Sequence, residues 1–387
     1  MREVAIVGVG QTQVGEHWSS SVRQLGADAI TATLRDAPDI QPEALIVANA
    51  FGSTFSSQSQ IGPLIAHFAG LGSIETWTVE AADASGGAAL RAGYLAVASG
   101  AVESVLVLGV EKSSDSIASA RIAGRNVALD ADYESAHGVT LTAQAALLMR
   151  RYMHEYGVEL AAFEGFSMNA HANGNKNPNA MFQNVLKPGA FQKASMVSDP
   201  VNLFDGAPDA DGAAGVLLIN ASSLRHTKHP LILVAGSAAG SDALALHERK
   251  DVLRLESAHK SAARALAQAE VSLDQINVFE AHDSYTILTA LALEAVGFAE
   301  RGQGWKWANE GGTQIRPNGQ LPLSTFGGLK ARGNPVGATG IYQAVEAVLQ
   351  LRGDAGALQV TGANIALIQS LAGVGSTAVS HVLRCMN

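Results

Sequence analysis

The chain has very little cysteine and few charged residues. Its 387 residues include a single cysteine, Cys385, which excludes an intrachain disulfide framework and a metal site built from several thiolates. Charged residues make up only 16%, and the net charge is −9 without a basic cluster, so nucleic acid and anionic membrane surfaces are not expected partners. No unbroken apolar stretch approaches the ~20 residues that a membrane span needs.

The N-terminus offers no room for a signal peptide, because residues 1–8 run directly into a strand pattern. No cluster of metal-ligating side chains is visible in the sequence either. We therefore expect a cytoplasmic protein that binds no metal ion and no cofactor of its own.

Apolar residues, by contrast, make up 47% of the chain and recur as short β-rich runs followed by Ala- and Gly-rich segments. Most of the runs are continuously apolar, as in sheets covered on both faces. Strands are predicted at residues 4–7, 45–47, 104–109, 216–219, 231–234, 278–280, 358–361 and 378–383, and helices at 87–98, 142–155, 256–269 and 286–296. This alternation predicts an α/β layered fold.

Two halves are predicted, residues 1–225 and 226–387, and each opens with a strand. The joint is placed around residues 226–230. Residues ~115–195 are rich in Asn, Lys, Met and Tyr, and predict an inserted subdomain of helices and loops on the first half. A chain of this length can form two or three domain-sized units with a large shared core.

Asp83 stands at the start of a predicted helix of small residues. A side chain there lies near free backbone N–H groups and the positive end of the helix, a setting that suits an anion. Asp83 could simply cap the helix, or it could be a polar active-site group. Ser85 is a conceivable nucleophile, but no base is recognisable beside it.

His282 and Tyr285 follow the predicted strand 278–280. In open α/β sheets, ligands bind at the carboxyl ends of strands. His282 could hold a substrate oxygen or shuttle a proton, and Tyr285 could do either as well. The alternative is a satisfied pair of His282 with Asp283 and a packed aromatic ring.

Residues 327–342 contain five glycines, which suggest close approach by a ligand or by another loop. Thr339 is a predicted N-cap, and Tyr342 lies on the first turn of the helix that runs to about residue 351. Lys330 and Arg332 could meet an anionic ligand or could be solvated. Tight turns are the alternative, and the segment has no phosphate-loop pattern.

A second glycine-rich segment, residues 366–376, precedes the last predicted strand. Backbone N–H groups near Gly373 or Gly375 could form an oxyanion hole. An ordinary β-hairpin turn explains the same pattern.

Taken together and in this order, the four segments resemble the thiolase superfamily over the whole chain. The resemblance is greatest to the archaeal and SCP-x-like (sterol-carrier, lipid-transfer) group, whose His-Asp-Ala-Phe-Thr motif is similar to residues 282–286; residues 152–157 and 203–214 resemble that group as well. It implies a thiolase fold of two similar layered α-β-α halves, and a homodimer that forms across a sheet edge.

The departures from the family pattern all affect its catalytic set. The resemblance implies that Asp83 stands at the position of the nucleophilic cysteine and that Asn334 replaces the His of Gly-His-Pro-x-Gly-Ala-Thr-Gly. The archaeal His-Asn pair before the final glycine turn aligns with Gln369 and Ser370, so only His282 of the usual set remains. Claisen condensation or thiolysis through an acyl-enzyme is therefore not expected.

Two of the six tyrosines, Tyr285 and Tyr342, fall inside these segments. In this the chain resembles thiolase-like aldolases that cleave the side chains of steroid acyl-CoAs, in which tyrosines of these regions are the catalytic candidates. Those enzymes work with a small OB-fold, zinc-ribbon acyl-CoA-binding partner. The resemblance implies an acyl-CoA lyase that splits a 3-hydroxyacyl-CoA by a retro-aldol step into a ketone or aldehyde and a shortened acyl-CoA. CoA would enter only as part of the substrate.

For this reaction we predict that Tyr285 and Tyr342 transfer the proton and orient the hydroxyl group. An unperturbed tyrosine, with a pKa of ~10, is a poor base at neutral pH, so a relay through His282 or Asp83 could assist. The enolate could be held by His282 and by N–H groups near Gly373 or Gly375. The predicted oxyanion- and substrate-binding residues are Asn334, Gly373, Gly375 and Ser85.

Two other functions fit the same residues. A chain that has lost its catalytic cysteine and histidine could be a non-catalytic thiolase-like subunit that binds acyl-CoA. A decarboxylase or hydrolase of acyl-CoAs that uses Asp83 is the second alternative.

Overall fold

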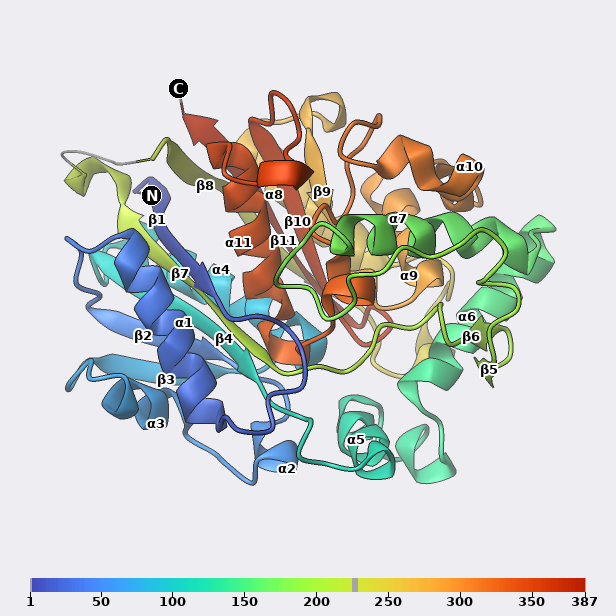
Figure 1. Ribbon diagram of the computed structural model, residues 1–387, viewed down its shortest axis with the longest axis horizontal. Helices are drawn as coiled ribbons and strands as arrows, with labels where there is room; N and C mark the ends of the chain where they lie inside the picture. Colours follow the sequence, from blue (N-terminus) through green and yellow to red (C-terminus); the bar gives the residue numbers. More distant parts are fainter. Residues whose placement is uncertain (1, 225–228, 387) are drawn as a thin grey trace.

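The computed structural model describes residues 2–224 and 229–386. Within them, one nine-stranded sheet has the order β3-β2-β4-β7-β1-β8-β11-β10-β9 (Figure 1). The strands are β1 (Val4–Gln11), β2 (Ala44–Ala48), β3 (Glu75–Val79), β4 (Ser104–Glu111), β7 (Gly212–Asn220), β8 (Leu231–Ser241), β9 (Val278–Glu280), β10 (Ile365–Ala372) and β11 (Thr377–Met386).

The antiparallel pair β1–β8 joins the strands of the first half to those of the second, with Ala5 opposite Leu233 and Ile6 opposite Ile232. Strands β2, β4 and β7 are buried at every position. Continuous burial of this kind requires that both faces of the sheet are covered, as their unbroken apolar sequences predict.

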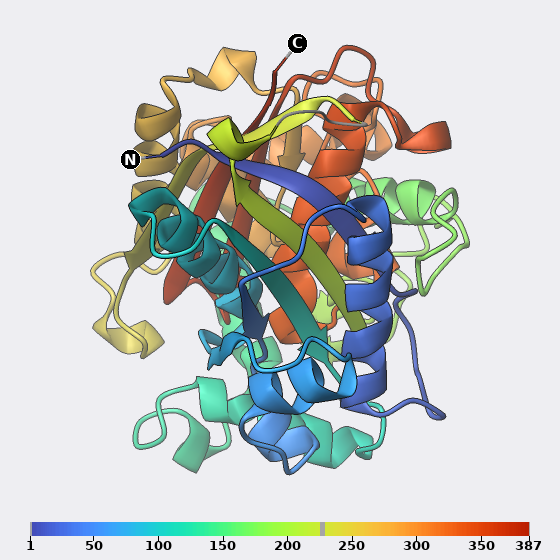
Figure 2. The same ribbon diagram turned by 90° about the vertical axis from the view of Figure 1, so that its left-hand side faces the viewer.

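Helices α4 (Ser85–Ser99) and α11 (Thr339–Arg352) lie between the two parts of the sheet, where each contacts strands of both halves. The outer faces are covered by α1 (Val22–Asp36) and α3 (Ile61–Phe68) on one side and by α8 (Glu256–Ala269) on the other (Figures 1 and 2). Helix α9 (Thr286–Val296) packs against α8. Two short helices are α2 (Gly52–Phe55) and α10 (Asn309–Gly312).

The starts of α4 and α11 approach each other closely. A Cβ atom at Gly86 would lie 2.6 Å from the backbone nitrogen of Gly340, and a Cβ atom at Gly340 would lie 2.3 Å from that of Gly87. Real Cβ atoms do not come so near to backbone, so only glycine permits this crossing. The predicted close approach in the glycine-rich segment is therefore made by another helix of the same chain.

The segment between residues 115 and 205 packs mainly beside the second half. It contains α5 (Ala118–Arg125), α6 (Leu141–Tyr156) and α7 (Glu164–Gly174), followed by the small hairpin β5 (Met196–Ser198) and β6 (Val201–Asn202). Helices α6 and α7 lie next to α9 in Figure 1 and contact it. The predicted joint at residues 226–230 falls largely outside the described residues.

The predicted strand at residues 358–361 is wrong. Leu358 ends a short 3₁₀ turn, and the strand of this region is β10, which starts at Ile365. The side chain of Gln350 on α11 donates to the carbonyl oxygen of Leu358 at 2.8 Å and accepts from the N–H of Val360 at 2.8 Å. Because a side chain satisfies these backbone groups, the apolar run is buried without pairing in a sheet.

Strand β3 was not predicted from the sequence. It is an edge strand whose side chains are mostly exposed or half-buried, so it lacks the apolar run that identified the other strands. None of the described helices combines the length and the hydropathy of a bilayer-crossing segment.

Candidate functional site

Asp83 lies in the 3₁₀ turn (Ala82–Ala84) that leads into α4, and it is 1% exposed. Its Oδ1 accepts a hydrogen bond from Nη2 of Arg125 at 2.5 Å. Its Oδ2 is buried without a hydrogen-bond partner among the described residues. The side chain does not cap α4, since no cap hydrogen bond forms there. Asp83 is therefore a buried carboxylate with one oxygen available.

Arg125, the last residue of α5, forms a second ion pair with Asp209 through its other terminal nitrogen. Neither residue was predicted from the sequence. A single arginine near the end of a short helix carries no local signal, and only the fold brings it to Asp83. Arg125 thus ties the segment after β4 to the start of α4.

His282 follows β9 and is 1% exposed. Neither ring nitrogen has a hydrogen-bond partner within the described part of the chain. Burial lowers the pKa of His282 to about 4, while the nearby negative charge of Asp83 opposes this effect and Arg125 adds to it. The imidazole is therefore neutral at neutral pH, and it lies within the electrostatic reach of the Asp83–Arg125 pair.

The suggested pair of His282 with Asp283 does not form. Asp283 accepts the backbone N–H of Leu329 at 2.8 Å instead. Burial raises the pKa of Asp283 to about 6. Its carboxylate stabilises the loop before α11 and does not pair with His282.

Tyr285 is half-buried, and its hydroxyl oxygen lies 2.9 Å from Oγ1 of Thr142 on α6. Burial raises the pKa of Tyr285, and the charges of Arg125, Asp209 and Asp83 also act on it. The ring lines a cavity of about 450 Å³. Tyr285 therefore lies near these three charged side chains, and its hydroxyl group is protonated at neutral pH.

Tyr342 lies elsewhere. It is fully buried, and its hydroxyl group is 3.1 Å from both the carbonyl oxygen and Oγ1 of Thr12. Its ring packs in the core around α4 and α11 and lies 5.0 Å from the guanidinium of Arg332, whereas Tyr285 packs against the core of the second half. The two predicted catalytic hydroxyls thus have separate partners.

The side chains of Asn334 and Ser85 form hydrogen bonds within the turns in which they lie. Oδ1 of Asn334 accepts from the N–H of Val336 and from the hydroxyl of Thr339, both at 3.0 Å. Thr339 is the first residue of α11 and not its N-cap. The hydroxyl of Ser85 donates to the carbonyl oxygen of Ala82 at 2.6 Å. The turns that precede α11 and α4 are stabilised in this way.

Gly373 and Gly375 form the turn between β10 and β11, with φ angles of 52° and 93° that favour glycine. Ala372, just before the turn, packs with Ala82 and Ala84, so the turn lies next to Asp83. The N–H of Gly375 donates to the carbonyl oxygen of Ala372 at 2.8 Å. The segment is a β-hairpin turn, which is one of the two interpretations of its sequence, and it lies next to Asp83.

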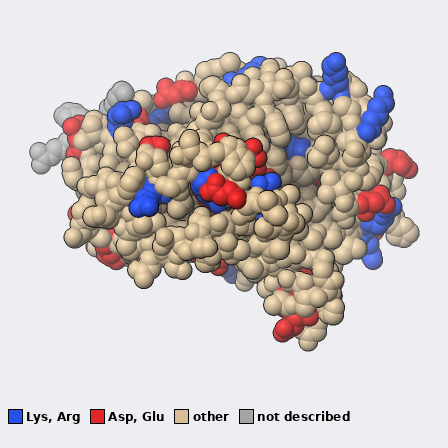
Figure 3. All heavy atoms as spheres, turned by 60° about the horizontal axis from the view of Figure 1, so that its bottom comes forward, with Lys and Arg blue, Asp and Glu red and all other residues tan. Residues whose placement is uncertain are grey.

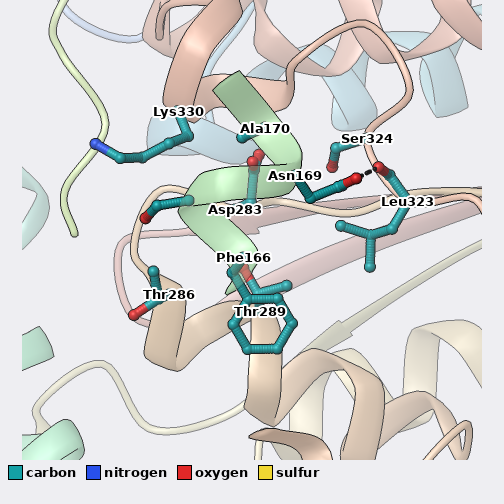
Figure 4. Close-up of a pocket in the computed structure, with 10 residues that line it drawn as sticks. Phe166, Asn169, Ala170, Asp283, Thr286, Thr289, Leu323, Ser324 and Lys330 are labelled. Atoms are coloured by element: carbon teal, nitrogen blue, oxygen red, sulfur yellow. Dashed lines mark hydrogen bonds between the residues drawn. The ribbon is translucent and has the colours of Figure 1, made fainter. Parts of the chain in front are cut away.

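Lys330 and Arg332 are buried, so the alternative that they are solvated is wrong. Arg332 pairs with Glu346 at 2.6 Å in the interior. Lys330 donates to the carbonyl oxygen of Gly206 at 2.5 Å. In Figure 4 its side chain extends away from Asp283 and Asn169, toward a neighbouring segment of the chain. Lys330 therefore lines the same cavity as Tyr285.

Comparison with known families agrees with this architecture. The model of the thiolase N-terminal domain matches residues 4–201, and that of the thiolase C-terminal domain-like family matches residues 238–385. The chain belongs to the thiolase family. The acetyl-CoA acetyltransferase of Methanothermobacter thermautotrophicus is 39% identical over 384 residues, which are 99% of each chain. Human sterol carrier protein 2 is 26% identical, covering 98% of this chain and 71% of that protein.

Two solved structures of thiolase-like proteins share the fold. The Ltp2-ChsH2(DUF35) aldolase superposes with a TM-score of 0.85 at 23% identity, covering 99% of this chain and 98% of that one. The monomeric SCP2-thiolase like protein type 1 of Mycobacterium smegmatis gives a TM-score of 0.73 at 17% identity, over 99% and 77% of the two chains. The predicted thiolase fold is thus confirmed.

The single cysteine of the chain lies on the last strand, β11. The Ala372–Thr377 pair at the β10–β11 turn lies next to the Asp83 turn, and Cys385 follows eight residues further along β11. At roughly 3.3 Å per residue, Cys385 lies about 26 Å along β11 from Thr377. The site therefore offers a carboxylate, a neutral imidazole, a phenol and a guanidinium, but no thiol.

Proposed function

We propose that this thiolase-family chain is an acyl-CoA lyase that cleaves a 3-hydroxyacyl-CoA by a retro-aldol step. The observation that carries the proposal is the convergence of Asp83, His282 and Tyr285 around Arg125, with Cys385 at the other end of β11 from the turn beside Asp83. A retro-aldol reaction needs acid–base groups but no covalent acyl-enzyme. These residues supply the acid–base groups, and none of them is a thiol that could form an acyl-enzyme.

In the proposed reaction, the β-hydroxyl group gives its proton to His282. The bond between the α- and β-carbons breaks, its electron pair forms the thioester enolate, and the β-carbon becomes the carbonyl of a ketone or aldehyde. His282 then returns the proton to the α-carbon, which gives the shortened acyl-CoA. The neutral, unpaired ring can accept this proton, and the negative charge of Asp83 stabilises the imidazolium as it forms.

Tyr285 acts in this scheme as a hydrogen-bond donor to the β-oxygen. Burial raises its pKa, which makes the phenol a poor base but a competent donor. The N–H of Gly375 is used within its turn, so we propose the N–H of Gly373 as the donor to the enolate oxygen. Such a donor contributes roughly 3–4 kcal/mol to transition-state stabilisation.

Asn334, Ser85 and Tyr342 take supporting roles in the proposal, because their polar atoms are engaged with the turns or with Thr12. Tyr342 holds α11 against the segment after β1. We propose that it positions the starts of α11 and α4 and does not contact the substrate.

The names of similar proteins support a CoA thioester as substrate and a lyase as the activity. The relative from Methanothermobacter thermautotrophicus is an acetyl-CoA acetyltransferase, and the solved Ltp2-ChsH2 protein is an aldolase. The cavity beside Tyr285 is lined by apolar side chains such as Phe204 and Val201. A bulky apolar acyl group, steroid-like in character, suits this lining, and no cofactor is needed for the reaction as written.

We further propose a homodimer and a small OB-fold, zinc-ribbon acyl-CoA-binding partner. Strand β3 is an open sheet edge with Trp77 37% exposed, which supports pairing with a second copy. Around α5, which carries Arg125, the exposed residues Ile117, Ile122 and Val127 offer apolar surface for the partner. The face that Figure 3 shows is mostly uncharged, and its Lys, Arg, Asp and Glu side chains gather in a few small groups. A monodisperse monomer in light scattering would contradict the dimer.

The direct test uses the chain co-expressed with an OB-fold protein encoded beside it, if there is one, and a 3-hydroxy-3-alkyl acyl-CoA. Mass spectrometry should detect a ketone and the shortened acyl-CoA in equal amounts. Tight binding without cleavage across a range of acyl groups would instead favour the non-catalytic subunit. Cleavage of a malonyl-type thioester with release of carbon dioxide would favour the decarboxylase.

A further inference from the structure

The cavity beside Tyr285 is apolar over most of its surface but holds two further titratable side chains, His171 and Lys330. Its apolar lining includes Phe182, Val197, Val201, Leu203 and Phe204. Burying charged or polar groups in such surroundings is costly unless they are hydrogen-bonded. The partners of His171 and Lys330 therefore indicate what the cavity is built to hold.

His171 on α7 is 6% exposed and stacked on Phe182, with ring centroids 6.0 Å apart and planes 14° apart. Its Nδ1 lies 3.1 Å from the carbonyl oxygen of Asn184. A carbonyl oxygen only accepts, so Nδ1 carries the hydrogen, and in the neutral ring Nε2 is left as an acceptor. Burial, reinforced by the charge of Lys330, lowers the pKa of His171 and keeps the ring neutral. Nε2 is buried without a partner among the described residues.

Lys330 presents the complementary group. Its ammonium has three N–H donors, and within the described residues its one hydrogen-bond acceptor is the carbonyl oxygen of Gly206, at 2.5 Å. Burial lowers its pKa to about 8, although the carboxylates of Asp205 and Asp283 act to raise it. The side chain is 4% exposed, so bulk water does not satisfy the remaining donors. A buried donor thus lies near a buried acceptor.

We propose that this part of the cavity binds a hydroxyl group on the acyl part of the ligand, whose oxygen accepts from Lys330 and whose hydrogen is donated to Nε2 of His171. A hydroxyl group is both acceptor and donor, and so satisfies both residues. A ketone would satisfy Lys330 alone. A carboxylate would place a second acceptor against Nε2, and an ammonium group would repel Lys330.

The inference rests on the proposed function only in taking an acyl-CoA as the ligand, and it adds the substrate class: an apolar acyl group with a hydroxyl beyond the β-carbon. Gly206 lies beside both Lys330 and Tyr285. Its carbonyl oxygen binds Lys330, while a Cβ atom on the same residue would lie 3.2 Å from the Tyr285 ring. Tyr285 faces the reacting end next to Arg125, and Lys330 with His171 recognises the body of the acyl group.

The test is a binding experiment that requires no cleavage. Dodecanoyl-CoA and its monohydroxy isomers, with the hydroxyl at each carbon from C4 to C12, are titrated calorimetrically into the protein together with any partner it needs. Each isomer lacks the β-hydroxyl and so resists retro-aldol cleavage. We expect one isomer, or two neighbouring ones, to bind about 10- to 100-fold more tightly than dodecanoyl-CoA, as for a hydrogen bond to a charged group.

Two variants locate the preference. His171→Phe keeps the stacked ring without the acceptor, and Lys330→Met keeps the stem without the charge. Each should abolish the preference for the hydroxylated isomer and leave the affinity for dodecanoyl-CoA unchanged or higher, which a misfolded variant would not do. Thr142→Val, in the same cavity, is the control and should retain the preference.

Equal affinities for the parent and all isomers would overturn the inference and would indicate that water satisfies the two residues. A preference that survives both variants, or that Thr142→Val removes, would place the hydroxyl elsewhere. Because binding and cleavage are measured separately, failure of this inference leaves the lyase proposal standing, and absence of cleavage leaves this inference testable.

Discussion

Arg125 and Asp83 form an ion pair of 2.5 Å between the end of α5 and the turn that starts α4. The two side chains are 16% and 1% exposed. Arg125 also pairs with Asp209, so one guanidinium is shared by two carboxylates. The pair holds the segment after β4 against the site. Without Arg125, the buried carboxylate of Asp83 would have no charged partner.

Arg125→Met should therefore lower the free energy of unfolding by about 3–5 kcal/mol, the usual effect of leaving a buried charge unpaired. Urea denaturation measures this change. Arg150→Met is the matched control, because Arg150 pairs with Asp199 on the surface with both side chains more than half exposed; it should change stability by less than about 1 kcal/mol. Equal small effects would mean that Asp83 is not held as a buried ion.

The substitution Tyr285→Phe should mainly lower turnover, whereas Tyr342→Phe should mainly lower stability. Removing the Tyr285 hydroxyl should lower kcat for cleavage by roughly 10²- to 10⁴-fold, as for a group that acts directly on the reacting hydroxyl. Tyr342→Phe should retain more activity but lose about 1 kcal/mol of stability, since Thr12 loses a buried partner. Turnover assays and denaturation of both variants decide this. Near-wild-type turnover of Tyr285→Phe would refute the role given to Tyr285, and unchanged stability of Tyr342→Phe would refute the role given to Tyr342.

Cys385→Ser should leave cleavage unchanged. Cys385 is half-buried near the end of β11, and burial raises the pKa of its thiol, which disfavours the reactive thiolate. Intact-mass spectrometry during turnover should accordingly detect no acylated protein in the wild type. An acyl adduct that disappears in Cys385→Ser would contradict the non-covalent mechanism.

Glu280→Gln should stabilise the protein increasingly as the pH rises. Burial, and then the negative charge of Glu346, raise the pKa of Glu280 from 4.5 to about 8. The folded chain therefore holds a proton that the unfolded chain releases, so wild-type stability from this group is full below pH 4.5 and is lost as the pH rises toward 8. A glutamine oxygen can still accept from the N–H and hydroxyl of Thr325, which lie 3.0 and 2.8 Å from the carboxylate.

The measurement is the melting temperature of wild type and Glu280→Gln between pH 5 and pH 8. The difference between them should grow across this range. Glu248→Gln, at an exposed position, controls for the removal of one negative charge. A difference that stays constant with pH would show that Glu280 does not carry the proton.

Elements with a local sequence signal could be predicted from the amino-acid sequence alone. The helices predicted at 256–269 and 286–296 and the strand at 278–280 match α8, α9 and β9 at both ends. Their apolar periodicity and terminal residues specify them without reference to the rest of the chain. The same local signals placed Asp83 at the start of a helix and His282 after a strand, where the structure has them.

The interaction partners of those residues could not be predicted, because they depend on the folded arrangement of the chain. Arg125 meets Asp83 across 42 positions of sequence, and the hydroxyl of Tyr342 meets Thr12 across 330. An isolated arginine or tyrosine has the same local pattern whether it is solvated or buried against a distant partner. Hydropathy and turn chemistry act over a few residues, whereas ion pairs and buried hydroxyl contacts depend on distances that exist only after the two halves of the sheet have packed around α4 and α11.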